Sequence, residues 1–313
     1  MKNRNRRDFL KYLIGTSAYL SLGSVPFELI AKKGFHKLTI LYTNDVHSHI
    51  DPFPDNDPKF PSMGGVVSRA ALIRRIRNEE KNVLLFDAGD IFQGTPYFNR
   101  FGGVPELKLM SMMGYDAATI GNHDFDNGID GIVKVMPNMN FPFICSNYDF
   151  SSTAMAGKTV PYRIFEKEGI RIGVFGLGIE LEGLVPKNCF GKTFFLDPVQ
   201  KAAEMAFFLK KEMKCPLVIC LSHLGYFYKS NKISDHALAR QSKNIDLIIG
   251  GHTHTFLDSP PAYRNKENKE IFVCQVGWAG LKLGRIDAFL EGNLAETRME
   301  STIETIRKKT SEI

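Results

Sequence analysis

The sequence predicts an α/β fold in which part of the sheet is antiparallel. Apolar, β-rich runs alternate with segments of helical periodicity along most of the chain, as expected for strands connected by helices. Three late apolar runs, at 271–276, 282–290 and 297–303, follow one another without long helices between them, and these indicate antiparallel strands. With 313 residues, of which 43% are hydrophobic and 24% charged, the chain can form one large globular domain or two ordinary ones.

The N-terminal segment, residues 1–36, has the layout of an export signal. A basic stretch precedes a moderately apolar one, and the sequence RRDFLK at 6–11 is similar to the twin-arginine signal that an export receptor reads. A surface amphipathic helix is the alternative interpretation. No clear small-x-small cleavage site follows, so the segment can be cleaved or remain as a membrane tether. We therefore expect an exported protein, periplasmic or tethered to the membrane and facing the periplasm.

Charge and cysteine content argue against two kinds of site. Residues 1–37 hold eight Lys and Arg against two acidic residues, which accounts for the whole net charge of +6. The balanced remainder does not predict a basic surface for a nucleic-acid duplex. Of the five cysteines, Cys145, Cys220 and Cys274 lie in apolar runs, and the sequence has no CxxC motif. We therefore expect neither a disulfide framework nor a thiolate metal site.

Five apolar runs are expected to form strands, and each is followed at once by polar groups. In chain order, KLTILY precedes TNDVHSH, NVLLF precedes DAGDIFQG, AATI precedes GNHDFD, LVICL precedes SHLG, and IDLII precedes GGHTH. Helical spacing occurs between them at 66–77 and at 198–213, where Pro198 suits a first helical turn. The polar segment 258–270 is expected to be a loop or a hairpin arm.

The polar residues that follow these strands are of the types that coordinate divalent metal ions. In chain order they are Asp45, His47, Asp87, Asp90, Gln93, Asn122, His123, Asp124, Asp126, His223, His252 and His254. Strand ends in α/β proteins form the crevice in which ligands bind. Asp45 and His47, like His252 and His254, are two residues apart, so an extended backbone directs both side chains of each pair the same way. Such carboxylate, imidazole and amide ligands suit Mn, Zn, Fe or Co.

Each motif alone has an ordinary alternative. Asn, Asp and Gly favour turns, so ATIGNHDFDNG at 117–127 can be read as a polar turn that ends a strand. An isolated Asp-x-His is more often a hydrogen-bonded pair than a metal site. Five such motifs in this order are not explained by turns. We therefore predict a metal centre at the strand ends.

Taken together, NDVHSH, DAGDIFQG, GNHDFD, SHLG and GGHTH resemble the motifs of the calcineurin-like metallophosphoesterases. Within that family the chain is most similar to the 5′-nucleotidase catalytic domain, and the segment GGVVSRAALIRRIR from Gly64 also resembles that subgroup. The resemblance covers about residues 38–300. It implies a four-layer αββα sandwich with mixed sheets and two divalent metal ions at the strand ends.

The resemblance also implies how the metal ions are held. One ion would be bound by Asp45, His47, Asp90 and His254, and the other by Asn122, His223 and His252, with Asp90 bridging both. Two ions roughly 3.5–4 Å apart can clamp a phosphoryl group and activate a water as hydroxide between them.

The remaining polar residues receive roles around this centre. His123 resembles the family's catalytic histidine, which stabilises the transition state and protonates the leaving alkoxide, and Asp126 would orient it and favour its charged form. Asp124 is expected to make supporting or turn hydrogen bonds. Gln93 is expected either to brace the metal loop or to contact the substrate. His49 is expected either to face the substrate or to be an exposed loop histidine.

The domain organisation expected from the resemblance is incomplete. The 5′-nucleotidases usually add a second domain of comparable size that stacks the base, whereas this chain stops at Ile313. We expect an export segment at 1–36 and a catalytic domain at 37–313, without a C-terminal nucleotide-binding domain. A separate polypeptide could supply the base-binding domain. Alone, the chain is expected to discriminate weakly among AMP, GMP and UMP.

The sequence therefore favours an exported two-metal phosphomonoesterase of the 5′-nucleotidase type. It would hydrolyse nucleoside monophosphates or related small phosphate esters through attack by a metal-activated hydroxide. A cyclic-nucleotide phosphodiesterase that uses the same site is the first alternative. A non-catalytic binding partner on the same fold is the second, and the complete set of ligand positions argues against it.

Overall fold

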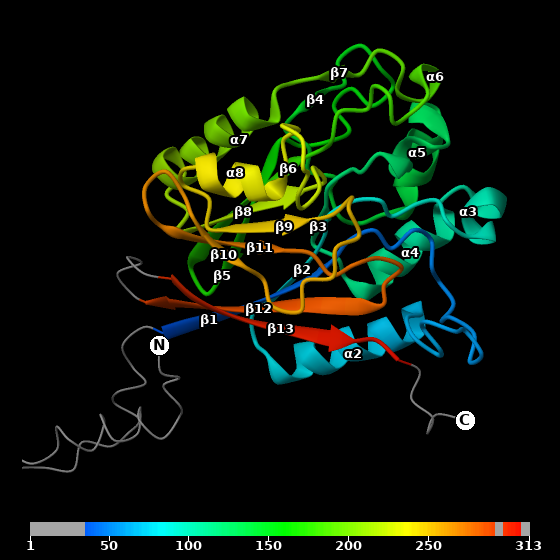
Figure 1. The fold of residues 1–313 in the computed structure, drawn as a ribbon, viewed down its shortest axis with the longest axis horizontal. Helices are drawn as coiled ribbons and strands as arrows, with labels where there is room; N and C mark the ends of the chain where they lie inside the picture. The colour runs from blue at the N-terminus through cyan, green and yellow to red at the C-terminus, as the bar shows by residue number, and fades with distance from the viewer. Residues whose placement is uncertain (1–34, 292–296, 308–313) are drawn as a thin grey trace, which may run out of the picture. The chain divides into compact units, whose positions relative to one another are not determined.

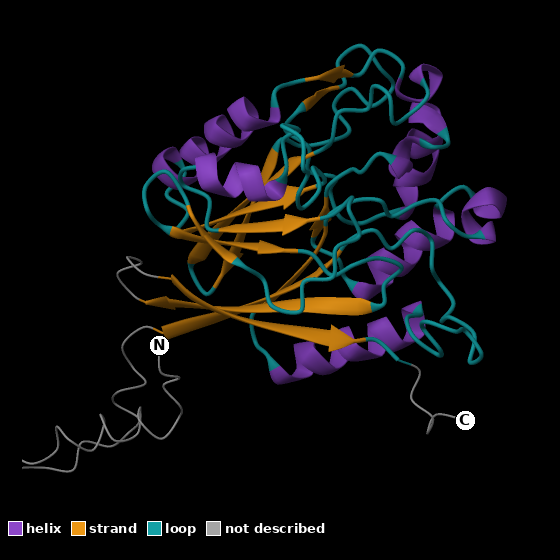
Figure 2. Ribbon diagram, viewed as in Figure 1, coloured by secondary structure: helices purple, strands orange, loops and turns teal. Residues whose placement is uncertain are grey.

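Two β-sheets lie face to face at the centre of the fold, and helices cover their outer faces (Figures 1 and 2). The computed structural model describes residues 35–291 and 297–307. The predicted export segment at 1–36 lies almost wholly outside the described residues. None of the helices in the described part of the chain is long and apolar enough to cross a bilayer.

The first sheet contains five strands in the order β13-β12-β1-β2-β3. Its members are β1 (Phe35–Thr43), β2 (Val83–Asp87), β3 (Ala117–Ala118), β12 (Lys282–Glu291) and β13 (Thr297–Thr305). β2 is parallel to both β1 and β3, whereas β12 and β13 form an antiparallel pair. The prediction that part of the sheet is antiparallel is therefore confirmed by β12 and β13, whereas the run at 271–276 forms β11, which is parallel to β9.

The second sheet contains six strands in the order β10-β11-β9-β8-β6-β5. Its members are β5 (Tyr162–Lys167), β6 (Ile170–Leu177), β8 (Leu217–Ser222), β9 (Leu247–Gly250), β10 (Ala262–Arg264) and β11 (Glu270–Cys274). The four inner strands are parallel, and both edge strands run antiparallel to their neighbours. The segment 258–270 thus supplies a hairpin arm through β10. A separate pair joins β4 (Tyr148–Asp149) to β7 (Phe194–Phe195).

The helices form two outer layers and a set of shorter connections. α2 (Val66–Glu79) and α4 (Val104–Met113) cover the first sheet, while α7 (Pro198–Phe207) and α8 (Asp235–Gln241) cover the second (Figure 1). The shorter helical segments are α3 (Pro96–Phe101), η2 (His123–Phe125), α5 (Gly128–Val135), η3 (Met136–Asn138) and α6 (Lys187–Phe190). The predicted helix 198–213 divides at Phe208, where a π-helical turn, η4 (Phe208–Glu212), continues α7.

Alternate side chains of the central strands enter different hydrophobic cores, as the twofold repeat of a strand requires. Ile40 of β1 and Leu84 of β2 lie between the two sheets, whereas Leu41 and Leu85 pack under α2 and α4. In the second sheet, the cluster containing Val218 packs under α7 and α8. Three cores separate four layers, which confirms the αββα sandwich.

The AATI run forms a shorter strand than its sequence suggests. Only Ala117 and Ala118 pair with β2, although the apolar run continues to Ile120. The chain then turns, and the Gly121 N–H donates to the carboxylate of Asp124 over 2.8 Å. The polar turn therefore begins directly beside the end of β2, and it brings the GNHDFD residues to the ends of both sheets.

Candidate metal centre

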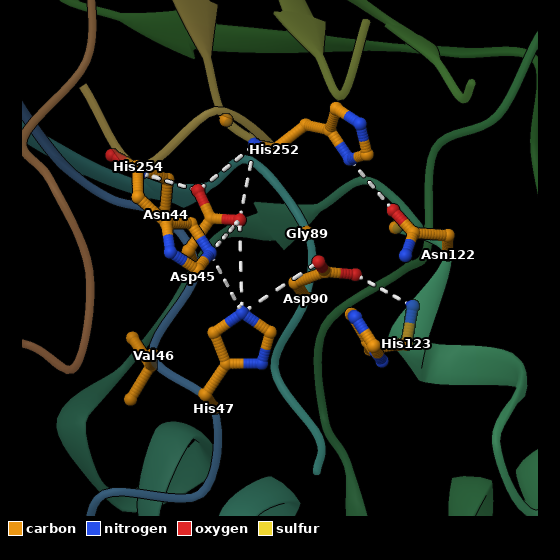
Figure 3. A network of polar contacts seen from close by, with 12 residues as sticks. Asn44, Asp45, Val46, His47, Gly89, Asp90, Asn122, His123, His252 and His254 are labelled. Carbon is orange, nitrogen blue, oxygen red and sulfur yellow. Dashed lines mark hydrogen bonds and ion pairs between the residues drawn. The ribbon is translucent and has the colours of Figure 1, made fainter. Parts of the chain in front are cut away.

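Two groups of metal-ligating side chains lie side by side where the strand ends of the two sheets meet (Figure 3). The first group is Asp45, His47 and His254, and the second is Asp90, His223 and His252. Within each group the ligand atoms all lie within 4.8 Å of one another. Each group combines residues that follow strands of the first sheet with residues that follow β8 or β9 of the second.

Asp90 joins the two groups into one centre, and Asn122 extends the second group. The Asp90 Oδ2 atom lies 3.1 Å from His223 Nε2 and 3.7 Å from His47 Nε2, so this carboxylate stands between the groups. Asn122 accepts a hydrogen bond at Oδ1 from His252 Nδ1 over 2.8 Å. The structure therefore brings together all seven residues predicted as ligands.

Main-chain carbonyls set the orientation of two of the imidazoles. His47 Nδ1–H donates to the Gln93 carbonyl over 3.0 Å, and His223 Nδ1–H donates to the Ala88 carbonyl over 2.7 Å. These bonds fix the tautomer and leave Nε2 of each ring facing the centre. Gln93 thus braces the site through its backbone, which is one of the two roles expected for it.

Five of the seven residues have a left-handed backbone, which non-glycine residues rarely adopt. They are Asp45, His47, Asp90, His252 and His254, with φ between 48° and 72°. Each such residue costs about 1–3 kcal/mol and persists only where the surroundings fix it. Main-chain bonds do so here, because Asp45 N–H donates to Gly89, His47 N–H to Asp90, and Ala279 N–H to Asp45. The extended backbone expected at Asp45, His47, His252 and His254 is therefore wrong, because the chain turns at each of these residues.

The centre concentrates buried negative charge beside imidazoles. Asp45 and Asp90 are 0% and 1% exposed. Burial lowers the pKa of His223, but the Asp90 carboxylate outweighs it and raises this pKa to about 10. Burial likewise opposes ionisation of Asp90, yet the charge on His223 holds the pKa of Asp90 well below its usual range. The buried carboxylates therefore require positive charge, which protons on imidazoles or metal ions can supply.

His123 and Asp126 form a hydrogen-bonded pair at the edge of the centre. Their spacing of three residues brings the side chains together across the single 3₁₀ turn η2, with His123 Nδ1 2.9 Å from Asp126 Oδ2. This bond raises the pKa of His123, although burial opposes the rise. The His123 backbone N–H donates to Asp90 Oδ1 over 2.8 Å, and its ring centroid lies 5.3 Å from that of His47.

Asp124 supports the centre through the backbone, as expected. Its fully buried carboxylate accepts from the N–H groups of Gly121, Asp90, Ile91 and Phe92, over 2.8 to 3.1 Å. These bonds tie the loop after β2 to the turn after β3. The two loops approach so closely that a Cβ atom at Gly121 would lie 2.1 Å from Asp90 Oδ1, which is why only glycine fits there.

The structure also shows what Asp87 and His49 contact. Asp87 accepts bonds from the Thr43 hydroxyl over 2.6 Å and the Gly89 N–H over 2.9 Å, so its buried carboxylate fixes the end of β2. His49 is half-buried and stacks on Phe53 with ring centroids 5.4 Å apart. The alternative of an exposed loop histidine is therefore wrong, because packing against this ring covers His49.

Three supporting residues were missed by the sequence analysis. Asn44 donates to both Asp45 Oδ2 and the Gly277 carbonyl over 2.6 Å. Gln275 donates to the Gly251 carbonyl over 2.5 Å, and Trp278 stacks on His254 with ring centroids 5.7 Å apart. The available signals were the position of Asn44 beside Asp45 and the only tryptophan of the chain, but neither predicts its distant partner.

Comparison with known proteins relates this chain to a family of phosphoesterases. A family model described as calcineurin-like phosphoesterase matches residues 38–256. A snake venom 5′-nucleotidase from Gloydius brevicauda is 35% identical over 302 residues, which cover 89% of this chain and 50% of that protein. The trifunctional nucleotide phosphoesterase protein YfkN of Bacillus subtilis is 33% identical over 300 residues, covering 85% of this chain and 19% of that protein.

Solved structures show the same relation. The 5′-nucleotidase precursor from Thermus thermophilus superposes with a TM-score of 0.79 and 30% sequence identity, covering 87% of this chain and 55% of that one. The chain thus spans half or less of the length of these two curated relatives, and little more than half of this structure.

Proposed function

The chain belongs to the calcineurin-like phosphoesterase family, and on this premise we propose that it is a two-metal phosphomonoesterase acting on nucleoside monophosphates or related small phosphate esters. The observation that carries the proposal is the pair of ligand groups with Asp90 between them. The names of the relatives, which include several 5′-nucleotidases, support the substrate class.

The residues of the centre fit divalent metal ions. His223 Nε2 is buried without a hydrogen-bond partner although it faces Asp90 Oδ2 at 3.1 Å, an arrangement that a cation would satisfy. The mixture of carboxylate, imidazole and amide donors suits Mn, Zn, Fe or Co. We propose that one ion is held by Asp45, His47, Asp90 and His254, and the other by Asp90, Asn122, His223 and His252.

The reaction divides between the ions and the His123–Asp126 pair. When bound, two such ions withdraw charge from a phosphoryl group and make water a stronger nucleophile at neutral pH. His123 uses Nδ1 for Asp126, so Nε2 is free to give a proton to the leaving oxygen. Asp126 is the positioning residue that fixes the tautomer and favours the charged ring. The bond from the His123 N–H to Asp90 holds the acid beside the centre.

Metal removal and reconstitution test the proposal. Chelation should abolish hydrolysis of AMP, and Mn or a similar divalent ion should restore it. Asp90→Ala should remove activity and lower metal content, because Asp90 serves both groups. The control Glu267→Ala removes an exposed carboxylate from the β10–β11 turn and should change neither. Full activity in protein verified to be metal-free would contradict the two-metal proposal.

A substrate comparison separates the proposed activity from its alternatives. The reconstituted protein should hydrolyse AMP faster than 2′,3′-cyclic AMP. The reverse preference would identify a phosphodiesterase, and binding of nucleotides without hydrolysis of any ester would identify a non-catalytic partner.

We also propose that the protein is exported through its N-terminal segment. The support is the RRDFLK sequence at 6–11 followed by a moderately apolar stretch. Replacing Arg6 and Arg7 by Lys should leave precursor in the cytoplasm, since the receptor reads the arginine pair and not only its charge. Arg4→Lys is the matched control and should be exported normally. Unchanged export of the double variant would exclude the twin-arginine route.

A further inference from the structure

A cavity of about 580 Å³ opens between the loop that follows His47 and helix α3. Its volume lies within the range of ordinary small-molecule sites, about 300–1,000 Å³. The residues that matter for its chemistry are His49, Phe53, Thr95, Tyr97, Arg100 and Phe101. None of them belongs to either ligand group.

Aromatic rings line the cavity from both sides. On the loop, His49 stacks on Phe53 with ring centroids 5.4 Å apart and an interplanar angle of 17°. On α3, Tyr97 stacks on Phe101 at 6.4 Å and 27°. Phe101 is 47% exposed, and the Arg100 guanidinium lies 5.5 Å from the centre of its ring. The cavity therefore offers flat apolar surfaces with a positive charge at one wall, the features that bind a planar aromatic group.

One wall is bonded to the proposed metal ligand His47, and the other to its neighbour Ser48. The His49 ring donates from Nδ1 to the His47 carbonyl over 2.9 Å. On the other wall, the Thr95 hydroxyl donates to the Ser48 carbonyl over 2.8 Å. A Cβ atom at Gly94 would lie 2.7 Å from the His47 carbonyl oxygen, so the two walls meet closely at this residue.

His47 also lies beside His123, the proposed proton donor. The His47 and His123 ring centroids are 5.3 Å apart, so the residue bonded to the His49 wall lies beside the proposed proton donor. Trp278 provides a second connection, because its ring lies 5.3 Å from His49 and stacks on His254 at 5.7 Å. The cavity therefore lies next to the ligand group of Asp45, His47 and His254.

We propose that this cavity is a subsite for an aromatic leaving group, in particular the base of a nucleotide. The inference rests on the proposed phosphoesterase function, because the subsite would bind the leaving group of that reaction. Stacking recognises the flat face that every base presents and does not read its edge. The subsite should therefore favour nucleotides over phosphate esters without a ring, while discriminating weakly among AMP, GMP and UMP.

Adenosine binding to metal-free protein tests the cavity without any reaction. Phe101→Ala should weaken binding about tenfold, the scale of losing one base–aromatic stack. Tyr97→Leu, which keeps an apolar side chain but removes the ring, should act in the same direction. Phe194→Ala is the matched control, since Phe194 is 64% exposed on β7 and does not line the cavity. Circular dichroism verifies that each variant is folded. Failure of the unmodified protein to bind adenosine would overturn the inference.

Kinetics with two substrates separate this inference from the proposed function. In the metal-loaded protein, Phe101→Ala should raise the KM for AMP about tenfold and leave the kinetics with ribose 5-phosphate unchanged. Equal losses for both substrates would mean that α3 only supports the His47 loop, and unchanged kinetics for both would mean that no ring binds there. Either result overturns the subsite but not the phosphoesterase. If the metal-loaded protein hydrolyses neither ester, the proposed function fails. The adenosine-binding measurement then still shows whether the cavity binds an aromatic base.

Discussion

At the scale of single residues, Asp124 arranges the proposed metal ligands without belonging to either ligand group. Its carboxylate accepts four backbone N–H bonds that join the loop of Asp90 to the turn of Asn122. Asp124→Asn replaces one acceptor oxygen by a donor and leaves buried N–H groups unpaired. We expect a loss of about 1–3 kcal/mol in the free energy of unfolding, measured with urea, together with weaker metal binding. Asp130→Asn, an exposed change in α5, should alter neither quantity.

His123 allows chemistry to be separated from metal binding. His123→Ala should retain both metal ions, measured by elemental analysis, and lose roughly two to four orders of magnitude in turnover of AMP. The loss should be smaller with p-nitrophenyl phosphate, because p-nitrophenolate leaves without a proton. An equal loss with both substrates would refute the acid role.

The sequence predicted which candidate ligands lie together better than it predicted the residues that support them. Each ligand stands in a short motif after a strand, where residue type and position are both informative. Asn44, Gln275 and Trp278 act through contacts that the fold creates, such as the bond from Asn44 to a carbonyl 233 residues away. No local pattern encodes such a contact.

At the scale of elements, the N-terminus of α7 is fixed by a single side chain. Asp197 accepts from the N–H groups of Val199 and Gln200 over 2.7 and 3.0 Å, and Pro198 occupies the first turn. Asp197→Ala should lower the free energy of unfolding by about 1 kcal/mol, measured with urea, because two N–H groups lose their acceptor. Activity should not change, since α7 lies on the outer face of the second sheet. Glu212→Ala, an exposed change beyond the other end of α7, should have a much smaller effect on stability.

Element types were easier to predict than element ends. Helix α2 follows its predicted range closely, since apolar spacing and burial agree over its length. The run at 198–213 does not continue as one α-helix, because a π-turn begins at Phe208. β3 is short because Asp124 draws Gly121 into the turn, and this contact depends on the neighbouring strand β2.

At the scale of the whole molecule, the two ligand groups connect the sheets. Each group takes at least one residue from the strand ends of each sheet, so bound ions would cross-link the two layers. Metal at a hundred times its Kd should add about 2.7 kcal/mol per site to the free energy of unfolding. Calorimetry should therefore show a higher Tm with metal than with chelator. In Asp90→Ala this difference should be much smaller, and an undiminished difference would place the stabilising ions elsewhere.

The sequence patterns do not predict which strand belongs to which sheet. A strand buried on both faces is continuously apolar in either sheet, so the runs alone do not assign β2 to one sheet and β8 to the other. The four layers followed only from the family resemblance. The place of β12 between β13 and β1 was likewise not encoded in any local pattern.

The position of β12 beside β1 delays the completion of the first sheet. β1 is an early strand, yet its neighbour β12 is translated late: Thr39 bonds to Asp287 across 248 residues. Such distant pairing slows folding, since a long loop must close before the contact forms. Residues as far as β12 must therefore be translated before the first sheet is complete and before the Ala279 N–H can bond to the Asp45 carbonyl. A metal ion that needs Asp45 held in this way would be acquired only after that point, so the ions available where folding finishes would help decide which ones the protein carries.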